Sequence, residues 1–232
     1  MATDIDDDSL AELEELLHED PELGLRVIAA MPPPLRETPP VLYLRAQGHA
    51  ACGAWEDVVE TLRRAVEVDD EDADAHHLLG SAYLELDDHD RGRAHYLRTW
   101  ELDGAADEAD VDGPLADRIA DEARRVLDSL PQEYQERLGN VLVVLEPRPS
   151  RALVEEGFDP RAYGLFEGLD HVAHLNHAQS TQITRIVLFS TNLCADFPEP
   201  EDLMEEVRVT VLHEVGHYFG LDEDDMVRLG LE

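Results

Sequence analysis

The chain has 232 residues, 43% of them hydrophobic, and 54 acidic against 18 basic residues give it a formal charge of −36. All 18 basic residues are arginine, which excludes chemistry that needs a lysine amine, such as Schiff-base catalysis or a phosphate-binding P-loop. This acidity argues against nucleic acid and anionic membrane as partners, because both carry charge of the same sign. Basic peptides and cations are compatible with it.

Cysteine spacing and the first residues bear on the cellular compartment. Cys52 and Cys194 lie 142 positions apart, which is not the pattern of a disulfide-stapled secreted domain. The start, MATDIDDDSL, has neither the positive region nor the apolar region of a signal peptide, and no segment approaches 18 consecutive apolar residues. We therefore expect the protein in the reducing cytoplasm.

Two stretches of the first half, 39–72 and 73–106, align as helix-turn-helix units in a 34-residue register. In the second unit, Gly80 allows close approach of two helices, and apolar residues stand where the helices must touch. These are Leu79, Tyr83, Tyr96 and Leu102, and the first unit has Leu42, Ala46, Val58, Leu62 and Ala65 at the matching places.

A third, degenerate unit occupies residues 5–38, which read as two short helices with a proline-rich stop. The small and aromatic residues of these units resemble the tetratricopeptide repeat, although its usual tryptophan and proline are missing. The resemblance implies an all-α repeat domain over 1–106 with a concave surface for a peptide or protein partner. A plain helical bundle without a partner is the alternative.

The pattern changes after residues 107–113, an acidic linker without apolar periodicity. Residues 115–130 have the apolar spacing of an amphipathic helix, and VLVVLE at 141–146 and QITRIVLF at 182–189 are typical of short strands. The sequence therefore predicts a small α+β domain over 114–232.

Residues 200–219 predict the last helix of this domain, because proline and acids begin it and Gly220 follows it. Apolar residues recur at fourfold spacing and predict its buried stripe: Leu203, Val207, Val211, Val215 and Phe219.

This helix carries HEVGH, residues 213–217, with two histidines one turn apart. On a helix His213 and His217 stand one above the other, so both imidazoles can meet a single zinc ion. Glu214 faces the free side of such an ion without ligating it, where it can act as a general base. Many HExxH matches are surface helices, but the strong amphipathicity and the following glycine favour a site.

A third zinc ligand can be bounded by counting. Only 15 residues follow His217 and none is histidine, so the candidates downstream are Asp222, Glu223, Asp224, Asp225 and Glu232. Gly220 would turn the backbone and bring the next residues back over the metal. Glu223 is the favoured ligand and Asp222 the second.

The second half resembles the bacterial minimal zincin-like metallopeptidases, built around HExxHxxGxx(D/E). The resemblance rests on DSLPQEY, GNVLVVLE, GLFEG, QITRIVLF and EEVRVTVLHEVGHYFGLDEDDMVRLGL. It implies zinc on His213 and His217, an acidic third ligand at Glu223 and Glu214 as the base. It also implies that the substrate lies along an edge strand, for which 182–189 is the candidate.

One stretch departs from that family. LDHVAHLNHAQST, after GLFEG, places His171, His174 and His177 three residues apart. They could add a metal site or an upstream ligand, but such histidines are more often polar loop residues. Arg185 could stabilise charge on a substrate, or, more commonly, solubilise a sheet edge.

Two functions compete. The first is a zinc-dependent peptidase whose helical repeats recruit a protein substrate or regulator. The second is a non-catalytic interaction protein whose zinc site is structural or vestigial. Glu214 separates them, because a purely structural site does not need it.

Overall fold

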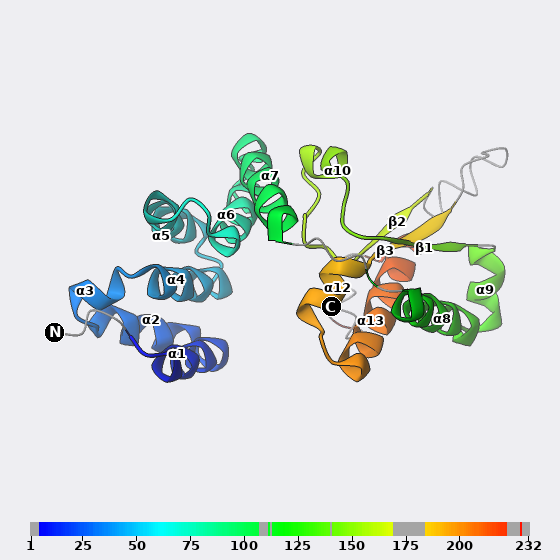
Figure 1. The fold of residues 1–232 in the computed structure, drawn as a ribbon, viewed down its shortest axis with the longest axis horizontal. Coiled ribbons are helices and arrows are strands. Elements are labelled where there is room, and N and C mark those ends of the chain that lie inside the picture. The colour runs from blue at the N-terminus through cyan, green and yellow to red at the C-terminus, as the bar shows by residue number, and fades with distance from the viewer. Residues whose placement is uncertain are drawn as a thin grey trace. The chain divides into compact units, whose positions relative to one another are not determined.

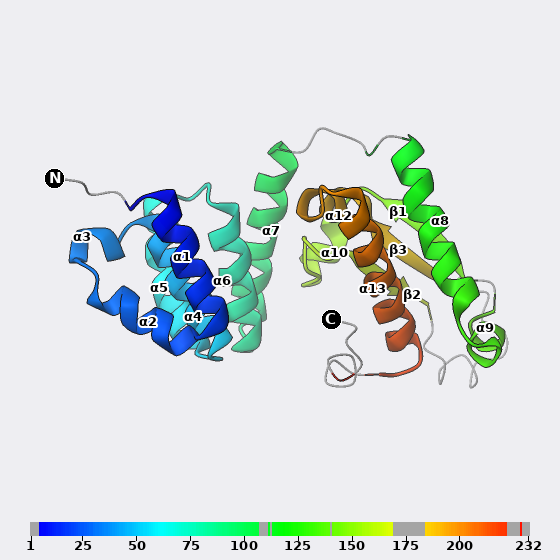
Figure 2. The ribbon, with the colours of Figure 1, turned by 90° about the horizontal axis from the view of Figure 1, so that it is seen from below.

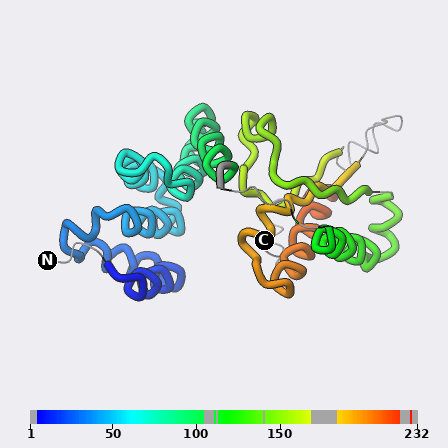
Figure 3. The backbone as a smooth tube through the Cα atoms, viewed as in Figure 1, coloured from blue at the N-terminus to red at the C-terminus, as the bar shows by residue number. Residues whose placement is uncertain are grey.

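The computed structural model divides the chain into two compact units (Figures 1 and 3). The helical unit is Met1–Ala106 with Ser150–Pro160, and the sheet unit is Asp107–Pro149 with Arg161–Glu232. The described residues are 5–106, 111, 113–139, 141–168, 184–221 and 228. Within these ranges no helix has the length and apolar character needed to cross a membrane.

Successive helices of the helical unit pack on one another (Figure 2). They are α1 (Asp7–Glu19), α2 (Pro21–Ala30), α3 (Pro33–Arg36), α4 (Pro39–Ala51), α5 (Trp55–Val68), α6 (Ala73–Glu85), α7 (His89–Ala106) and α10 (Arg151–Glu155). Asp6, Asp20 and Asp72 begin three of them, since each side chain accepts a hydrogen bond from the backbone N–H three residues on. Helix α6 starts 34 residues after α4, and α7 starts 34 residues after α5.

Packing between these helices follows the apolar pattern of the sequence. The predicted contact residues Leu42, Ala46, Val58, Leu62, Ala65, Leu79 and Tyr83 all belong to one buried cluster. Gly80 provides the predicted close approach, because a Cβ atom there would lie 2.4 Å from Cδ1 of Tyr96. Helices α6 and α7 therefore meet where glycine faces an aromatic ring.

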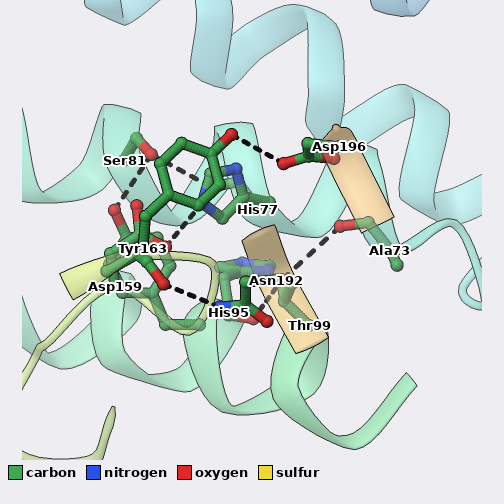
Figure 4. A network of polar contacts seen from close by, with 11 residues as sticks. Ala73, His77, Ser81, His95, Thr99, Asp159, Tyr163, Asn192 and Asp196 are labelled. Carbon is green, nitrogen blue, oxygen red and sulfur yellow. Dashed lines mark hydrogen bonds and ion pairs between the residues drawn. The ribbon is translucent and has the colours of Figure 1, made fainter. Parts of the chain in front are cut away.

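Residues 150–160 belong to the helical unit, whereas the sequence pattern predicts them within the α+β domain over 114–232. Side chains from this segment bind α6 and α7: Asp159 lies 2.8 Å from Nε2 of His77 (Figure 4), and Arg151 donates to Glu101 at 3.1 Å. The guanidinium of Arg151 also lies 5.9 Å from the ring centroid of Trp100. These partners are 50 to 82 residues apart in sequence, so no local pattern predicts the contact.

A histidine pair lies between α6 and α7. The Nδ1 atoms of His76 and His95 are 2.9 Å apart, so one ring donates and the other accepts, and Tyr83 stacks on His95. Burial lowers the pKa of both rings, that of His95 to about 4. The charged neighbours are Arg91 near His95, and Asp70, Asp72 and Arg98 near His76.

Acidification should destabilise the wild type more than it destabilises the His95→Gln variant. The folded state holds His95 neutral with a pKa of about 4, whereas the ordinary value is 6.5. Its stabilising contribution is complete above pH 6.5 and is lost as the pH falls toward 4. We expect the urea midpoint to drop further between pH 7 and pH 5 in the wild type. His89→Gln, exposed on the same helix, should keep the wild-type dependence; equal slopes for wild type and His95→Gln would contradict the argument.

In the described residues of the sheet unit, three strands form one sheet in the order β1-β3-β2. Its elements are α8 (Gly113–Ser129), α9 (Gln132–Leu138), β1 (Leu142–Glu146), β2 (Gly164–Glu167), β3 (Arg185–Phe189), α12 (Ser190–Asp196) and α13 (Pro200–Tyr218). Strands β1 and β3 run parallel, and β2 and β3 antiparallel. Helices α8 and α13 lie side by side against one face of the sheet (Figures 1 and 2).

Strand order overturns the prediction that 182–189 forms the substrate-binding edge. Strand β3 is central, paired with β1 on one side and β2 on the other. Arg185 does not solubilise an edge: its Nε donates to Glu167 at 2.6 Å, directly across the β2–β3 ladder, and NH1 lies 3.6 Å from Glu146. Among the strands that the structure describes, the edge strand beside α13 is β2, a four-residue segment that the strand prediction missed.

Candidate metal centre

Helix α13 positions the three residues of the HExxH motif. Its predicted apolar stripe is buried, with Leu203, Val207, Val211 and Val215 each at most 6% exposed. The helix ends at Tyr218, and Gly220 follows with φ of +81°, a left-handed conformation that suits glycine. The stripe fixes the rotation of the helix, and with it the direction of the histidines.

His213 and His217 lie next to each other on α13, as their spacing predicts. Their Nε2 atoms are 2.9 Å apart and their rings are nearly perpendicular, at 78°. One ring nitrogen donates to the other in this arrangement. Two imidazole nitrogens this close can also share one metal ion, because zinc binds neutral imidazole through such a nitrogen.

Glu214 is held between α13 and the edge strand. Its side chain is buried, with 8% exposed, and Oε2 accepts a hydrogen bond from the backbone N–H of Phe166 at 2.7 Å. That amide belongs to β2, so the edge strand orients the carboxylate. No residue pattern indicates this role of Phe166, because a backbone amide donates irrespective of the side chain that it carries.

Side chains outside the motif fix the elements around it. Arg208 on α13 donates to the buried Glu122 of α8 at 2.6 Å. The hydroxyl of Tyr218 donates to the carbonyl of Arg137 at 2.9 Å, which ties the end of α13 to α9. At the start of β2, the hydroxyl of Tyr163 donates to Asp196 at 2.7 Å (Figure 4).

The other predicted metal ligands lie outside the described residues. This holds for Glu223, the favoured third ligand, for Asp222, and for His171, His174 and His177. Among the described residues, no group of three or more histidine, cysteine, aspartate or glutamate side chains could hold a metal ion. The described part of the site therefore supplies two imidazole nitrogens, a ligand type that suits zinc, and the carboxylate of Glu214 next to them in sequence.

Gly164→Ala should destabilise the sheet unit. A Cβ atom at position 164 would lie 2.6 Å from Cγ2 of Thr210 and 3.2 Å from Oε1 of Glu214. Threonine is stiff about its first side-chain torsion, so β2 and α13 must separate, at a cost of about 1–3 kcal/mol. Urea unfolding measures the loss. Gly113→Ala is the control, because open space surrounds that position; equal stability of the two variants would refute the close contact.

Comparison with known proteins concerns the part of the chain that carries the HExxH motif. No curated protein matches the sequence. A family model does match, over residues 138–231, which contain β1, β2, β3 and α13. The family whose model these residues match is that of the zincin-like metallopeptidases.

Proposed function

We propose that the protein is a zinc-dependent peptidase, with His213 and His217 as zinc ligands, Glu223 as the third ligand and Glu214 as the general base. One observation carries the proposal: two histidine Nε2 atoms lie 2.9 Å apart beside a buried carboxylate that an edge strand orients. The match of residues 138–231 to a metallopeptidase family supports it.

Each protein group has a defined task in this reaction. Zinc, when bound, supplies a Lewis acid for activating water and polarising a carbonyl. Glu214 takes a proton from the attacking water and delivers it to the leaving amine. The amide of Phe166 donates to Oε2 of Glu214 and so orients the carboxylate for this proton transfer.

Strand β2 is the surface on which an extended peptide would lie. Each residue of a β-strand directs its own N–H and C=O groups to the same side of the strand. The N–H of Phe166 points to Glu214 rather than to β3. The carbonyl of Phe166 is thus directed the same way and can accept from a substrate amide. Backbone pairing of this kind gives affinity without side-chain selectivity.

The helical unit serves as a protein-binding module of tetratricopeptide-like repeats in this proposal. The 34-residue spacing of helix starts supports it, as does the contact of Gly80 with Tyr96. Repeat stacks of this type bury a continuous core and leave an extended surface for a partner.

A peptide-library assay tests the proposed reaction. The full chain, loaded with one equivalent of zinc, is incubated with a mixed peptide library, and new termini are identified by mass spectrometry. We expect cleavage that a chelator abolishes and added zinc restores. A protein that holds zinc and cleaves nothing would refute the peptidase and leave the non-catalytic interaction protein.

The third ligand has its own test. Glu223→Ala should lower zinc affinity far more than Asp222→Ala does. Glu223, the eleventh residue of HEVGHYFGLDE, is the favoured third ligand, and Asp222 is the second candidate. Competition with a chromophoric chelator measures both affinities. The opposite order would assign the ligand to Asp222.

A further inference from the structure

A small pocket of about 230 Å³ adjoins the candidate metal centre. It lies between α13 and the start of β2, and its lining includes Tyr163, Gly164, Glu206, Thr210, His213 and Glu214. The pocket is smaller than the roughly 300–1,000 Å³ of sites for whole small molecules, so it suits a single side chain. Because His213 and Glu214 form part of its wall, that side chain would belong to a residue beside the reacting bond.

Glu206 adds a second carboxylate to the lining of this pocket, besides that of Glu214. It precedes His213 by seven residues, which places both on the same face of α13, roughly 10 Å apart along the axis. Its carboxylate is half-buried and accepts a hydrogen bond from the hydroxyl of Thr210 at 3.3 Å. Burial raises its pKa, and the hydroxyl of Thr210 opposes that effect.

No cation among the described residues neutralises Glu206. Its neighbour Glu205 does have a counter-charge. Arg208, on another side of α13, forms ion pairs with Glu205 and Glu122. A half-buried carboxylate without a counter-charge is costly, and a cationic ligand would offset this cost.

We propose that the pocket binds the arginine or lysine side chain of a substrate residue next to the bond that is cut, with Glu206 as its counter-charge. The inference rests on the proposed peptidase function and names its substrate class, basic peptides. Arginine and lysine are the side chains that carry a positive charge far enough from the backbone to reach Glu206. The chain's formal charge of −36 attracts the same peptides from a distance.

The test compares two peptides that carry either arginine or its neutral isostere citrulline next to a cleaved bond and are otherwise identical. One such pair places this residue before the bond, and a second pair places it after the bond. For the wild type we expect kcat/KM about 10–100-fold higher with arginine. Glu206→Gln should remove this preference by lowering kcat/KM for the arginine peptide to the level of the citrulline peptide. Glu205→Gln, which removes a charge from the same helix outside the pocket, should keep the preference.

A binding measurement keeps the inference decidable without turnover. Calorimetry with the Glu214→Gln protein should give tighter binding of the arginine peptide than of the citrulline peptide, and Glu206→Gln in that background should equalise them. Equal binding of the two peptides, or a preference that survives Glu206→Gln, would overturn the assignment of the pocket. Selective binding by a wild type that cleaves nothing would instead refute the peptidase and leave the pocket assignment intact.

Discussion

Glu214→Gln is expected to abolish peptide hydrolysis, by at least about 100-fold in kcat, while zinc content stays at the wild-type level. The amide of glutamine cannot take a proton from water at neutral pH, so the general base is lost. Its side-chain carbonyl can still accept from the N–H of Phe166, which holds Glu214 at 2.7 Å. The variant therefore keeps the fold and loses the chemistry.

Three measurements separate these effects: metal analysis, hydrolysis of a cleaved library peptide, and urea unfolding. Glu201→Gln, an exposed carboxylate in the first turn of α13, is the matched control and should retain hydrolysis. Wild-type turnover by Glu214→Gln would remove Glu214 from the mechanism. Loss of zinc from it would mean that the carboxylate ligates the metal.

His213→Ala and His217→Ala should each lower zinc affinity by more than about 100-fold, because each removes a direct ligand of the metal. Removal of a residue that only hydrogen-bonds such a ligand already costs about 10–100-fold in metal affinity. The Nε2 atoms of these histidines are 2.9 Å apart, so each variant leaves one nitrogen donor in the described part of the site. Hydrolysis should fall with the metal and recover in part at high zinc concentration.

The chain contains a matched control for this experiment. His76 and His95 also place two ring nitrogens 2.9 Å apart, but between two helices of the helical unit. His95→Ala should leave the zinc content of the folded protein unchanged. A loss of zinc from His95→Ala and none from His213→Ala would place the metal in the helical unit and refute the proposed site.

The helix that carries the motif could be predicted because its signals are local. Fourfold apolar spacing from Leu203 to Val215 defined its buried face, and the same period placed His213 and His217 together. The apolar contacts among α4, α5 and α6 followed from sequence for the same reason. In each case residues within a few turns of one helix contain the information.

The edge strand could not be predicted in this way. A strand of four residues, GLFE, is too short to show a period, and the neighbours of a strand depend on how distant segments pack. QITRIVLF was therefore identified as a strand but assigned to the wrong place in the sheet. The hydrogen bond from Phe166 to Glu214 spans 48 residues and involves a backbone amide, which no residue pattern encodes.

Because residues 150–160 belong to the helical unit, this unit cannot complete its contacts until part of the sheet unit has been synthesised. The chain leaves the helical unit after residue 106, returns to it at 150 and leaves again after 160, so it crosses between the units three times. A ribosome must pass residue 160 before His77 can meet Asp159, by which time β1 is made but β2 and β3 are not. A cut between residues 106 and 113 would thus leave residues 150–160, which belong to the helical unit, on the C-terminal fragment, and the helical fragment would gain its full set of contacts only when the two reassociate.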